Sequence, residues 1–262
     1  MTQPSSHTHP ATQQARCPLR IATWNIHKGV RGIGPARRLE IHDMLHAVEG
    51  FDADLVCLQE VRGHNHKEQA HFAHWPDTPQ ADYLAPEGYS AIYRSNAFTR
   101  HGEHGNALLS RWPVVAVQHE DMSDHRLEQR GLLHVVVQAH GRDVHVVVVH
   151  LGLIAASRLR QLAQLKAFIG REVPPNNPLF VAGDFNCGNV AVKWSFDAMQ
   201  NVAYKSTSKT NTFPARLPLV PFDHVFARGA QRMAQHVPRG RIWARMSDHL
   251  PLIADFELPD AI

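Results

Sequence analysis

The sequence predicts one α/β domain in which β-sheets pack on each other and helices lie on the outside. Three observations predict this fold class. Apolar strand patterns fill most of residues 19–258, two helical patterns interrupt them, and neither a linker nor a fixed-period repeat divides the span. The length of 262 residues equals roughly 1.7 domains of ~150 residues, and the unbroken pattern favours one. We set the boundaries at residues 1–17, a polar segment expected to be a disordered tail, and residues 18–262, the folded domain.

The first half of the domain alternates strands with one helix. Residues 19–24 alternate in polarity and run into Asn25, which predicts a strand followed by the Gly-rich loop HKGVRGIG. Residues 39–50 have apolar side chains at helical spacing and end at Gly50. Residues 54–60 then form a short apolar run that ends in Glu60, which is typical of a buried strand. Short strands are expected at residues 89–93, 106–110 and 114–118.

The second half contains the clearest hairpin and the clearest helix. Strands are predicted at residues 132–139 and 144–150, and the run 146–149 is apolar on both faces, which favours a central position in its sheet. A helix is predicted over residues 157–171, with Leu159 on its apolar stripe and Gln161 on its polar side. Three further strands are expected at residues 179–184, 222–227 and 251–256, with a loop-rich stretch around residues 205–221.

Composition excludes several classes of protein. With 27 Lys and Arg, 24 Asp and Glu, a formal charge of +3 and 44% hydrophobic residues, the chain has the profile of a folded globular protein rather than a disordered or fibrous one. No apolar run approaches the ~18 residues of a membrane span, and the first residues lack a signal-peptide pattern. We therefore expect a cytoplasmic monomer without integral membrane association. Three cysteines without metal spacing exclude a disulfide scaffold.

The 20 histidines raise the question of a histidine metal site. His42 and His46 stand four residues apart on the predicted helix, and the segment 63–74 holds four more histidines. Neither segment contains a His-Glu-x-x-His pattern or pairs with cysteine, so zinc is not favoured. Most of these histidines are expected on the surface, where they make the net charge sensitive to pH.

Polar side chains collect at what we interpret as the C-terminal ends of apolar strands. The set comprises two amides, four carboxylates and two histidines: Asn25, Glu60, His150, Asp184, Asn186, Asp223, Asp248 and His249. Strand ends are where α/β folds gather their ligands. In the segment GDFN, Gly183 allows another group to approach the backbone closely.

These residue types suit one kind of chemistry. Carboxylate and amide oxygens are the ligands of a hard cation such as Mg²⁺ or Mn²⁺, which often binds substrate phosphate as well. Hydrolysis of a phosphodiester needs an activated water and hydrogen-bond donors for the phosphate oxygens. A divalent cation, two imidazoles and two amides supply these functions.

Seven motifs occur in the order in which one superfamily carries them: TWNIHKG, LQEV, GNALLSRWP, VHLGL, VAGDFN, FDHVF and SDHLPLIADF. Over residues 19–258 the chain resembles the endonuclease/exonuclease/phosphatase superfamily, which is also called deoxyribonuclease I-like. Within that superfamily it is most similar to an uncharacterised bacterial subgroup. The resemblance implies a four-layered α/β sandwich of two mixed sheets flanked by helices. It also implies an enzyme, a metal-dependent phosphoric ester hydrolase.

The resemblance assigns roles to the metal-binding and water-activating residues by position. Glu60 would bind catalytic Mg²⁺, or Mn²⁺, with Asn25 contacting metal or phosphate and Asp248 supporting the metal. Asp184 would orient or deprotonate the attacking water. The residues leave open whether Asp184 or the pair of His249 and Asp223 accepts the proton.

The same resemblance assigns the remaining roles. Asn186 would hold a phosphate oxygen, and Arg130 matches a position where several members carry a phosphate-binding arginine. His249 would contact the scissile phosphate and be oriented by Asp223. His150 matches the second histidine of the nuclease I, sphingomyelinase and toxin branches, which disfavours abasic-site repair.

The sequence does not fix which phosphodiester is the substrate. Residues 193–245 carry nine Lys and Arg against two acids, which suits a polyanionic partner, although scattered solvated charge explains the same count. A nuclease-like phosphodiesterase is the first hypothesis, and a phospholipid- or sphingomyelin-cleaving enzyme, or another small phosphoester hydrolase, is the second. A catalytically silent phosphate- or nucleic-acid-binding protein is the third, but a binding role gives no reason to keep the metal carboxylate and the oriented imidazole together.

Overall fold

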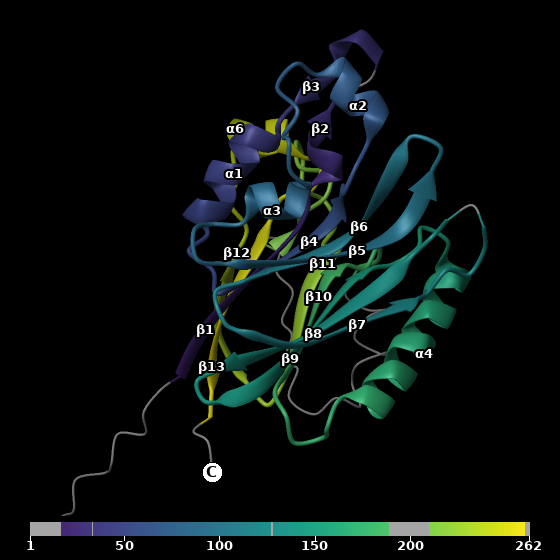
Figure 1. Cartoon of the computed structure of the whole chain (residues 1–262). Helices are drawn as coiled ribbons and strands as arrows, with labels where there is room; N and C mark the ends of the chain where they lie inside the picture. The colour runs from purple at the N-terminus through teal and green to yellow at the C-terminus, as the bar shows by residue number, and fades with distance from the viewer. Residues whose placement is uncertain (1–16, 33, 127, 189–209, 260–262) are drawn as a thin grey trace, which may run out of the picture.

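Two β-sheets form the centre of the computed structural model, which describes residues 17–32, 34–126, 128–188 and 210–259 (Figure 1). The six-stranded sheet has the order β12-β13-β1-β4-β6-β5, and the five-stranded sheet has the order β11-β10-β9-β8-β7. The strands of the first sheet are β1 (Cys17–Asn25), β4 (Leu55–Val61), β5 (Ser90–Thr99), β6 (Gly102–Ser110), β12 (Gln231–His236) and β13 (Leu252–Leu258). Those of the second are β7 (Val114–Asp121), β8 (Gly131–Ala139), β9 (Arg142–His150), β10 (Leu179–Asp184) and β11 (Asp223–Arg228). A small ribbon, β2 (Val30–Arg31) with β3 (Arg38–Leu39), stands apart.

Helices cover the outer faces of both sheets. They are α1 (Ile41–Gly50), α2 (His66–His71), α3 (Gln80–Leu84), α4 (Ala155–Glu172) and α6 (Arg241–Met246). Helices α1 and α3 pack on the six-stranded sheet and α4 packs on the five-stranded sheet (Figure 1). One apolar cluster fills the space between the sheets and one lies under the helices on each side. The predicted four-layered α/β sandwich is therefore confirmed.

Strand alternation decides which side chains face the space between the sheets. On β1, Leu19 and Ile21 pack into the inter-sheet cluster, whereas Ala22 and Trp24 pack under the helices. The same period of two applies to β9, β10 and β11, because successive side chains of a strand point to opposite faces. The inward rows of β1, β9 and β10 end in Asn25, His150 and Asp184, so the polar residues cap one edge of the apolar core.

The position of Asp223, Asp248 and His249 corrects the sequence interpretation. Asp223 is the first residue of β11 rather than the last residue of a strand, and Asp248 and His249 precede β13. Both strands run antiparallel to a neighbour that ends at this edge, since Asp223 pairs with Asp184 and Leu252 pairs with Thr23. An antiparallel strand begins where its partner ends, so these residues reach the same edge from the opposite direction.

The amphipathic pattern of α4 was wrong at two positions. Leu159 is 63% exposed, whereas Gln161 is 1% exposed. The buried amide is satisfied because its Oε1 accepts from the Gly152 nitrogen at 2.8 Å and its Nε2 donates to the Met122 carbonyl at 3.1 Å. A polar side chain can take a core position when it ties two loops together in this way.

Most other element boundaries lie within a few residues of the predicted ones, but β5 runs six residues past the predicted end at residue 93 and β6 starts four residues before the predicted start at residue 106, since the two strands pair as far as Thr99 and Gly102. The first strand begins at Cys17, two residues before the predicted start, because Cys17 pairs with Leu258. The predicted tail, residues 1–17, lies outside the described residues except for Cys17. The short elements β2, β3, α2, α3, β12 and α6 were not predicted. Within the described part of the chain, no helix combines the length and the apolar character needed to span a membrane.

Candidate active site

Two strands of the first sheet and two of the second bring their polar ends together. The Nδ2 atom of Asn25, at the end of β1, donates to Asp184 Oδ2 at 3.1 Å and lies 3.4 Å from Glu60 Oε1. All three side chains lie at the edge of the inter-sheet core, and Asp184 is 1% exposed. Asn25 therefore joins the carboxylate of β4 to the carboxylate of β10.

A β-bulge turns Glu60 toward this edge. The register of β4 against β6 shifts between Leu58 and Val61, and Glu60 has a positive φ of 56°. Simple alternation would place Glu60 on the side of Leu58, which packs under the helices. Because a bulge adds one residue to the strand, it re-aims the side chain, a device that is over-represented next to active sites.

Asp184 is the centre of the site. Its Oδ2 atom lies 3.5 Å from His150 Nε2 and 3.6 Å from His249 Nε2, in addition to its contact with Asn25. Its Oδ1 atom accepts from the Asn186 backbone nitrogen at 2.9 Å. One carboxylate is thus held by an amide and a backbone nitrogen, with two imidazoles beside it.

Asp223 orients His249 from behind. The Nδ1 atom of His249 lies 2.8 Å from Asp223 Oδ2, and both side chains are buried. The Phe213 ring packs against the imidazole at a centroid distance of 4.8 Å, and Trp24 Nε1 donates to the His249 carbonyl at 2.9 Å. Burial opposes charge on the ring, but the carboxylates of Asp223, Asp184 and Asp248 raise the pKa of His249 to about 10.

His150 has the opposite protonation behaviour. Burial, and then the Arg130 guanidinium, lower its pKa to about 4 against the opposing effect of Asp184. The site therefore holds one charged and one neutral imidazole at neutral pH. Two histidines on either side of one carboxylate have been given different protonation states by their surroundings.

The sequence carries a basic group just after Asn25, and the structure places its first member, Lys28, on a cationic side of the site together with His27. Lys28 Nζ forms an ion pair with Glu60 Oε2, and His27 Nδ1 lies 3.3 Å from Asp248 Oδ1 and 3.9 Å from Glu60 Oε2. Both residues lie in the tight turn after β1 and have positive φ angles, of 46° for His27 and 63° for Lys28. Burial opposes ionisation of Glu60, but Lys28, His150 and His27 hold its pKa well below the usual range. The signal in the sequence is HKG at residues 27–29, one residue beyond Asn25.

The remaining predicted residues surround the carbonyl of Leu151. Asn186 Nδ2 donates to it at 2.8 Å and Arg130 Nε donates at 3.3 Å. The Arg130 guanidinium also pairs with Glu128 at 3.1 Å. Asn186 retains a second amide hydrogen for a ligand, whereas Arg130 acts on His150 through its charge.

All nine residues singled out from the sequence thus belong to one connected set of contacts. Within the described residues, one group of three is close enough to hold a metal ion through His, Cys, Asp or Glu atoms, namely Asp184, Asp223 and His249. The close contact of His249 Nδ1 with Asp223 engages two of these side chains. The Phe213 ring and the Ser247 hydroxyl, which donates to the Asn25 carbonyl at 2.7 Å, complete the site. Neither was given a role from the sequence, although Ser247 is the first residue of the motif SDHLPLIADF.

Comparison with known proteins identifies the family. A profile of the endonuclease/exonuclease/phosphatase family matches residues 22–249, which include the whole site and every strand of both sheets except β13 and the first part of β1. The chain belongs to this family. It is accordingly a phosphoric ester hydrolase.

Relatives of the family cover the chain almost completely. The uncharacterised protein YbhP of Escherichia coli K12 is 36% identical over 249 residues, which is 92% of this chain and 96% of that protein. A family member from Bacteroides vulgatus has a TM-score of 0.69 at 18% identity, covering 92% of this chain and 99% of that one. A member from Beutenbergia cavernae has a TM-score of 0.68 at 21% identity, covering 94% of this chain and 73% of that one. These two structures share the fold of this chain.

Proposed function

We propose that the chain is a divalent-metal-dependent phosphodiesterase that hydrolyses its substrate with an activated water. The observation that carries this proposal is the environment of Asp184, which has Asn25, His150 and His249 around one oxygen and Asp223 behind His249. A buried carboxylate between two imidazoles can take a proton from water while the imidazoles contact the phosphate.

Glu60, Asn25 and Asp248 are the residues we assign to Mg²⁺, with Mn²⁺ as the alternative ion. Glu60 and Asp248 offer carboxylate oxygens, which fit a hard cation. The Asn25 amide turns its nitrogen to Glu60, and its oxygen accepts from the His27 backbone nitrogen at 3.0 Å. Glu60 already holds a cation, the Lys28 ammonium, and His27 reaches both Glu60 and Asp248. When bound, the metal ion would polarise the phosphate and neutralise the charge that develops in the transition state.

His249 is assigned the role of proton donor and Asp184 that of proton acceptor. The geometry supports this division because Asp223 engages Nδ1 of His249 and leaves Nε2 directed toward the site. A ring with a pKa of about 10 holds its proton at neutral pH. The water oxygen attacks phosphorus, its proton passes to Asp184, and the bond from phosphorus to the leaving oxygen breaks.

Asn186 and Arg130 are assigned to phosphate binding, and His150 to hydrogen bonding of a phosphate oxygen. Within the described residues, Asn186 Nδ2 donates one of its two hydrogens, to the Leu151 carbonyl, and the Asn186 backbone nitrogen fixes the Asp184 carboxylate. Arg130 places a positive charge near His150. Both nucleic acids and phospholipids contain the phosphodiester that this set recognises, so the nuclease-like reaction remains a prediction from the sequence.

Two substitutions test the assignment. Asp184→Asn and His249→Ala should abolish Mg²⁺-dependent hydrolysis of bis(p-nitrophenyl) phosphate while circular dichroism and thermal unfolding show a folded protein. Asp255→Asn is a matched control, because Asp255 pairs with Arg20 at 2.6 Å far from the site. Near-normal turnover by either site variant would refute the roles given to Asp184 and His249.

The substrate class is tested with a panel. Single- and double-stranded DNA, RNA, phospholipids and inositol phosphates should each be incubated with the protein and Mg²⁺ or Mn²⁺, beside Glu60→Ala. At least one substrate should be cleaved by the wild type and not by the variant. If the wild type and Glu60→Ala release equal amounts of product from every substrate, a phosphate-binding protein without catalytic activity would be favoured.

A further inference from the structure

A pocket of about 560 Å³ lies beside the segment that carries Asp248 and His249, and Leu250 of that segment is part of its lining. One wall is the loop of residues 213–220 and the other is α6. The loop is tied to the site, since the Ala215 nitrogen donates to the Asp248 carbonyl at 2.7 Å and the Leu250 nitrogen donates to the Thr212 carbonyl at 2.9 Å. The pocket therefore shares its loop wall and Leu250 with the segment that carries Asp248 and His249.

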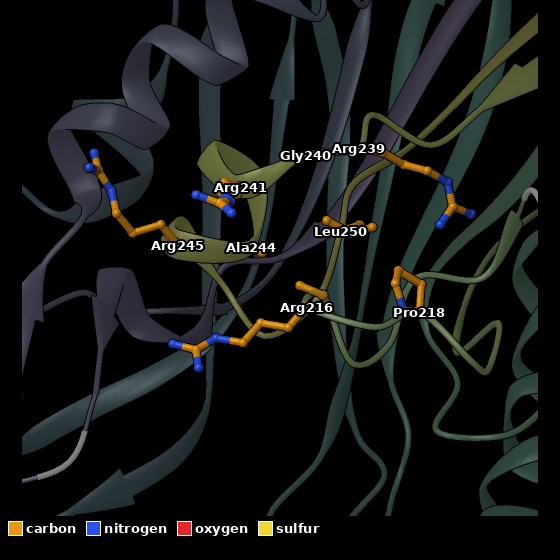
Figure 2. Close-up of a pocket in the computed structure, with 9 residues that line it drawn as sticks. Arg216, Pro218, Arg239, Gly240, Arg241, Ala244, Arg245 and Leu250 are labelled. Atoms are coloured by element: carbon orange, nitrogen blue, oxygen red, sulfur yellow. The ribbon is translucent and has the colours of Figure 1, made fainter.

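Four arginines line the pocket: Arg216, Arg239, Arg241 and Arg245. Figure 2 shows the side chains of Arg216 and Arg245 extending to one side, that of Arg239 to the other, and Arg241 between them. Arg245 pairs with Asp43 and Glu40. Arg216 and Arg241 are exposed and have no ion-pair partner within the described part of the chain. Their positive charge is available to an anionic ligand.

Large aliphatic side chains stand exposed beside these arginines. Leu217 is 65% exposed and Leu219 is 64% exposed on the loop, and Ile242 is 59% exposed on α6. Each follows or adjoins a pocket arginine or Pro218 in the sequence. Exposed aliphatic groups that are interspersed with cations are typical of surfaces that insert into the boundary between lipid headgroups and acyl chains.

Two further exposed aliphatic side chains lie on the turn that follows His150 at the end of β9. Leu153 and Ile154 are 68% and 54% exposed and follow His150 by three and four residues. The Leu153 nitrogen donates to Glu128 Oε1 at 2.9 Å, which holds this turn beside Arg130. Figure 1 shows α6 beside the six-stranded sheet and α4, which follows this turn, on the opposite side of the molecule beside the five-stranded sheet. The pair lies close to the site in sequence, because Leu153 is two residues beyond Leu151, whose carbonyl accepts from Asn186 and Arg130.

We propose that the surface around this pocket docks on an anionic lipid bilayer through Arg216, Arg241, Leu217, Leu219 and Ile242, so that a phospholipid headgroup supplies the phosphodiester. The proposal rests on the phosphodiesterase function proposed above. Anionic headgroups complement the unpaired guanidinium groups, and the aliphatic groups enter the layer below them.

A nucleic acid accounts less well for the same surface. Proteins that bind single strands stack bases on aromatic rings within a basic groove. The described lining of the pocket contains no aromatic residue, and three exposed aliphatic side chains have no role on a phosphate backbone. The basic-aromatic pair of Arg37 over Phe72 lines a separate pocket that has Arg245 in common with the first, and there Arg245 is paired with Asp43 and Glu40.

Vesicle sedimentation of the full chain tests the proposal. We expect binding to vesicles of equal parts phosphatidylglycerol and phosphatidylcholine, at least tenfold weaker binding to phosphatidylcholine alone, and weaker binding as salt screens the charges. Arg216→Glu and Arg241→Glu should each weaken binding about fivefold or more. The matched control is Lys166→Glu on the outer face of α4, which changes the charge equally and should leave binding unchanged.

The aliphatic contribution is tested separately. Leu217→Ser and Ile242→Ser should each weaken vesicle binding severalfold, whereas Val115→Ser, at a site that is 56% exposed on β7, should not. All these variants should hydrolyse bis(p-nitrophenyl) phosphate at the wild-type rate, because none of the substituted residues touches the catalytic groups. The soluble substrate thereby separates membrane docking from catalysis.

Three results would overturn the docking surface. They are absence of wild-type binding to anionic vesicles at low salt, equal weakening by Lys166→Glu, and loss of binding to a labelled single-stranded oligonucleotide in Arg216→Glu with vesicle binding unchanged. The last result would identify a nucleic-acid surface instead.

Failure of docking and failure of catalysis give different results. If vesicles are not bound while the aryl phosphodiester is still hydrolysed, the docking proposal fails and the proposed phosphodiesterase function stands. If vesicles are bound and no diester is hydrolysed, the proposed catalytic function fails.

Discussion

His249 Nδ1 lies 2.8 Å from Asp223 Oδ2, and both side chains are buried at the edge between the two sheets. This contact fixes the ring so that Nε2 faces Asp184. It also stabilises the charged imidazole, because a carboxylate in a buried position favours the protonated ring. The relationship explains why a histidine from the segment before β13 and an aspartate from the start of β11 act as a unit.

Asp223→Asn should therefore lower kcat for the aryl phosphodiester by two to four orders of magnitude, the usual contribution of an oriented acid or base. The amide cannot hold the charge on His249, so the pKa of the ring should fall from about 10. Steady-state kinetics measure the first effect, and NMR titration of the His249 ring measures the second. An unchanged ring pKa would show that Asp223 does not set the protonation of His249.

Gly183→Ala should destabilise the fold by about 3 kcal/mol, because the position combines a strained φ with a backbone clash. Gly183 has φ +149°, and a Cβ there would lie 1.9 Å from the Val149 carbonyl oxygen. Chemical denaturation measures the change. The matched control is Gly170→Ala in α4, where a Cβ meets nothing within 4 Å and alanine should be neutral or stabilising. Equal effects at both positions would contradict the close approach of β9 to Gly183.

Lys28→Gln should tighten metal binding at Glu60. The ammonium of Lys28 occupies Glu60 Oε2 and competes with an added cation. We expect the Mg²⁺ concentration for half-maximal activity to fall about tenfold, measured by titration of the metal-stripped protein. Weaker metal binding in the variant would instead make Lys28 a contributor to the metal and phosphate site.

The protein should lose stability as the pH falls from about 6.5 to 4. Under α4, His145 Nδ1 lies 3.0 Å from His134 Nε2, and His134 Nδ1 lies 2.8 Å from Gln118 Oε1. Burial, and then the neighbouring His145, lower the pKa of His134 to about 4. The folded state thus binds fewer protons than the unfolded state, where the pKa is ~6.5, so this contribution is complete above pH 6.5 and is lost toward pH 4.

The magnitude follows from the size of that pKa difference. His134 contributes a slope of about 1.4 kcal/mol per pH unit across this window, and at most about 3 kcal/mol in total. Denaturant unfolding at several pH values should show a shallower slope for His134→Gln than for the wild type. Identical slopes in the two proteins would mean that His134 does not titrate with folding.

The inward rows of the strands explain how much of the site the sequence predicts. Asn25, His150 and Asp184 continue the apolar rows of β1, β9 and β10 with the expected period of two. Their convergence followed from the strand patterns, because neighbouring strands that end together bring their last side chains together. The direction of β11 and β13 did not follow, since a strand pattern is the same when it is read in either direction.

Other features depend on backbone geometry that a polarity pattern does not record. Glu60 reaches the site through a bulge, and alternation alone would have turned it toward the helices. The contacts of Lys28 and His27 depend on two consecutive residues with positive φ. Gln161 is buried because two loop backbones pair with it, which outweighs the helical pattern of α4.

Metal-dependent hydrolysis by the wild type and by Glu60→Ala tests the central claim most directly. The measurement is the rate of bis(p-nitrophenyl) phosphate hydrolysis by metal-stripped protein as Mg²⁺ is added. The structure predicts no activity without metal, saturable activation of the wild type, and no activation of the folded variant. Activity of the stripped wild type, or equal activation of both proteins, would contradict a metal-dependent phosphodiesterase that binds its metal at Glu60.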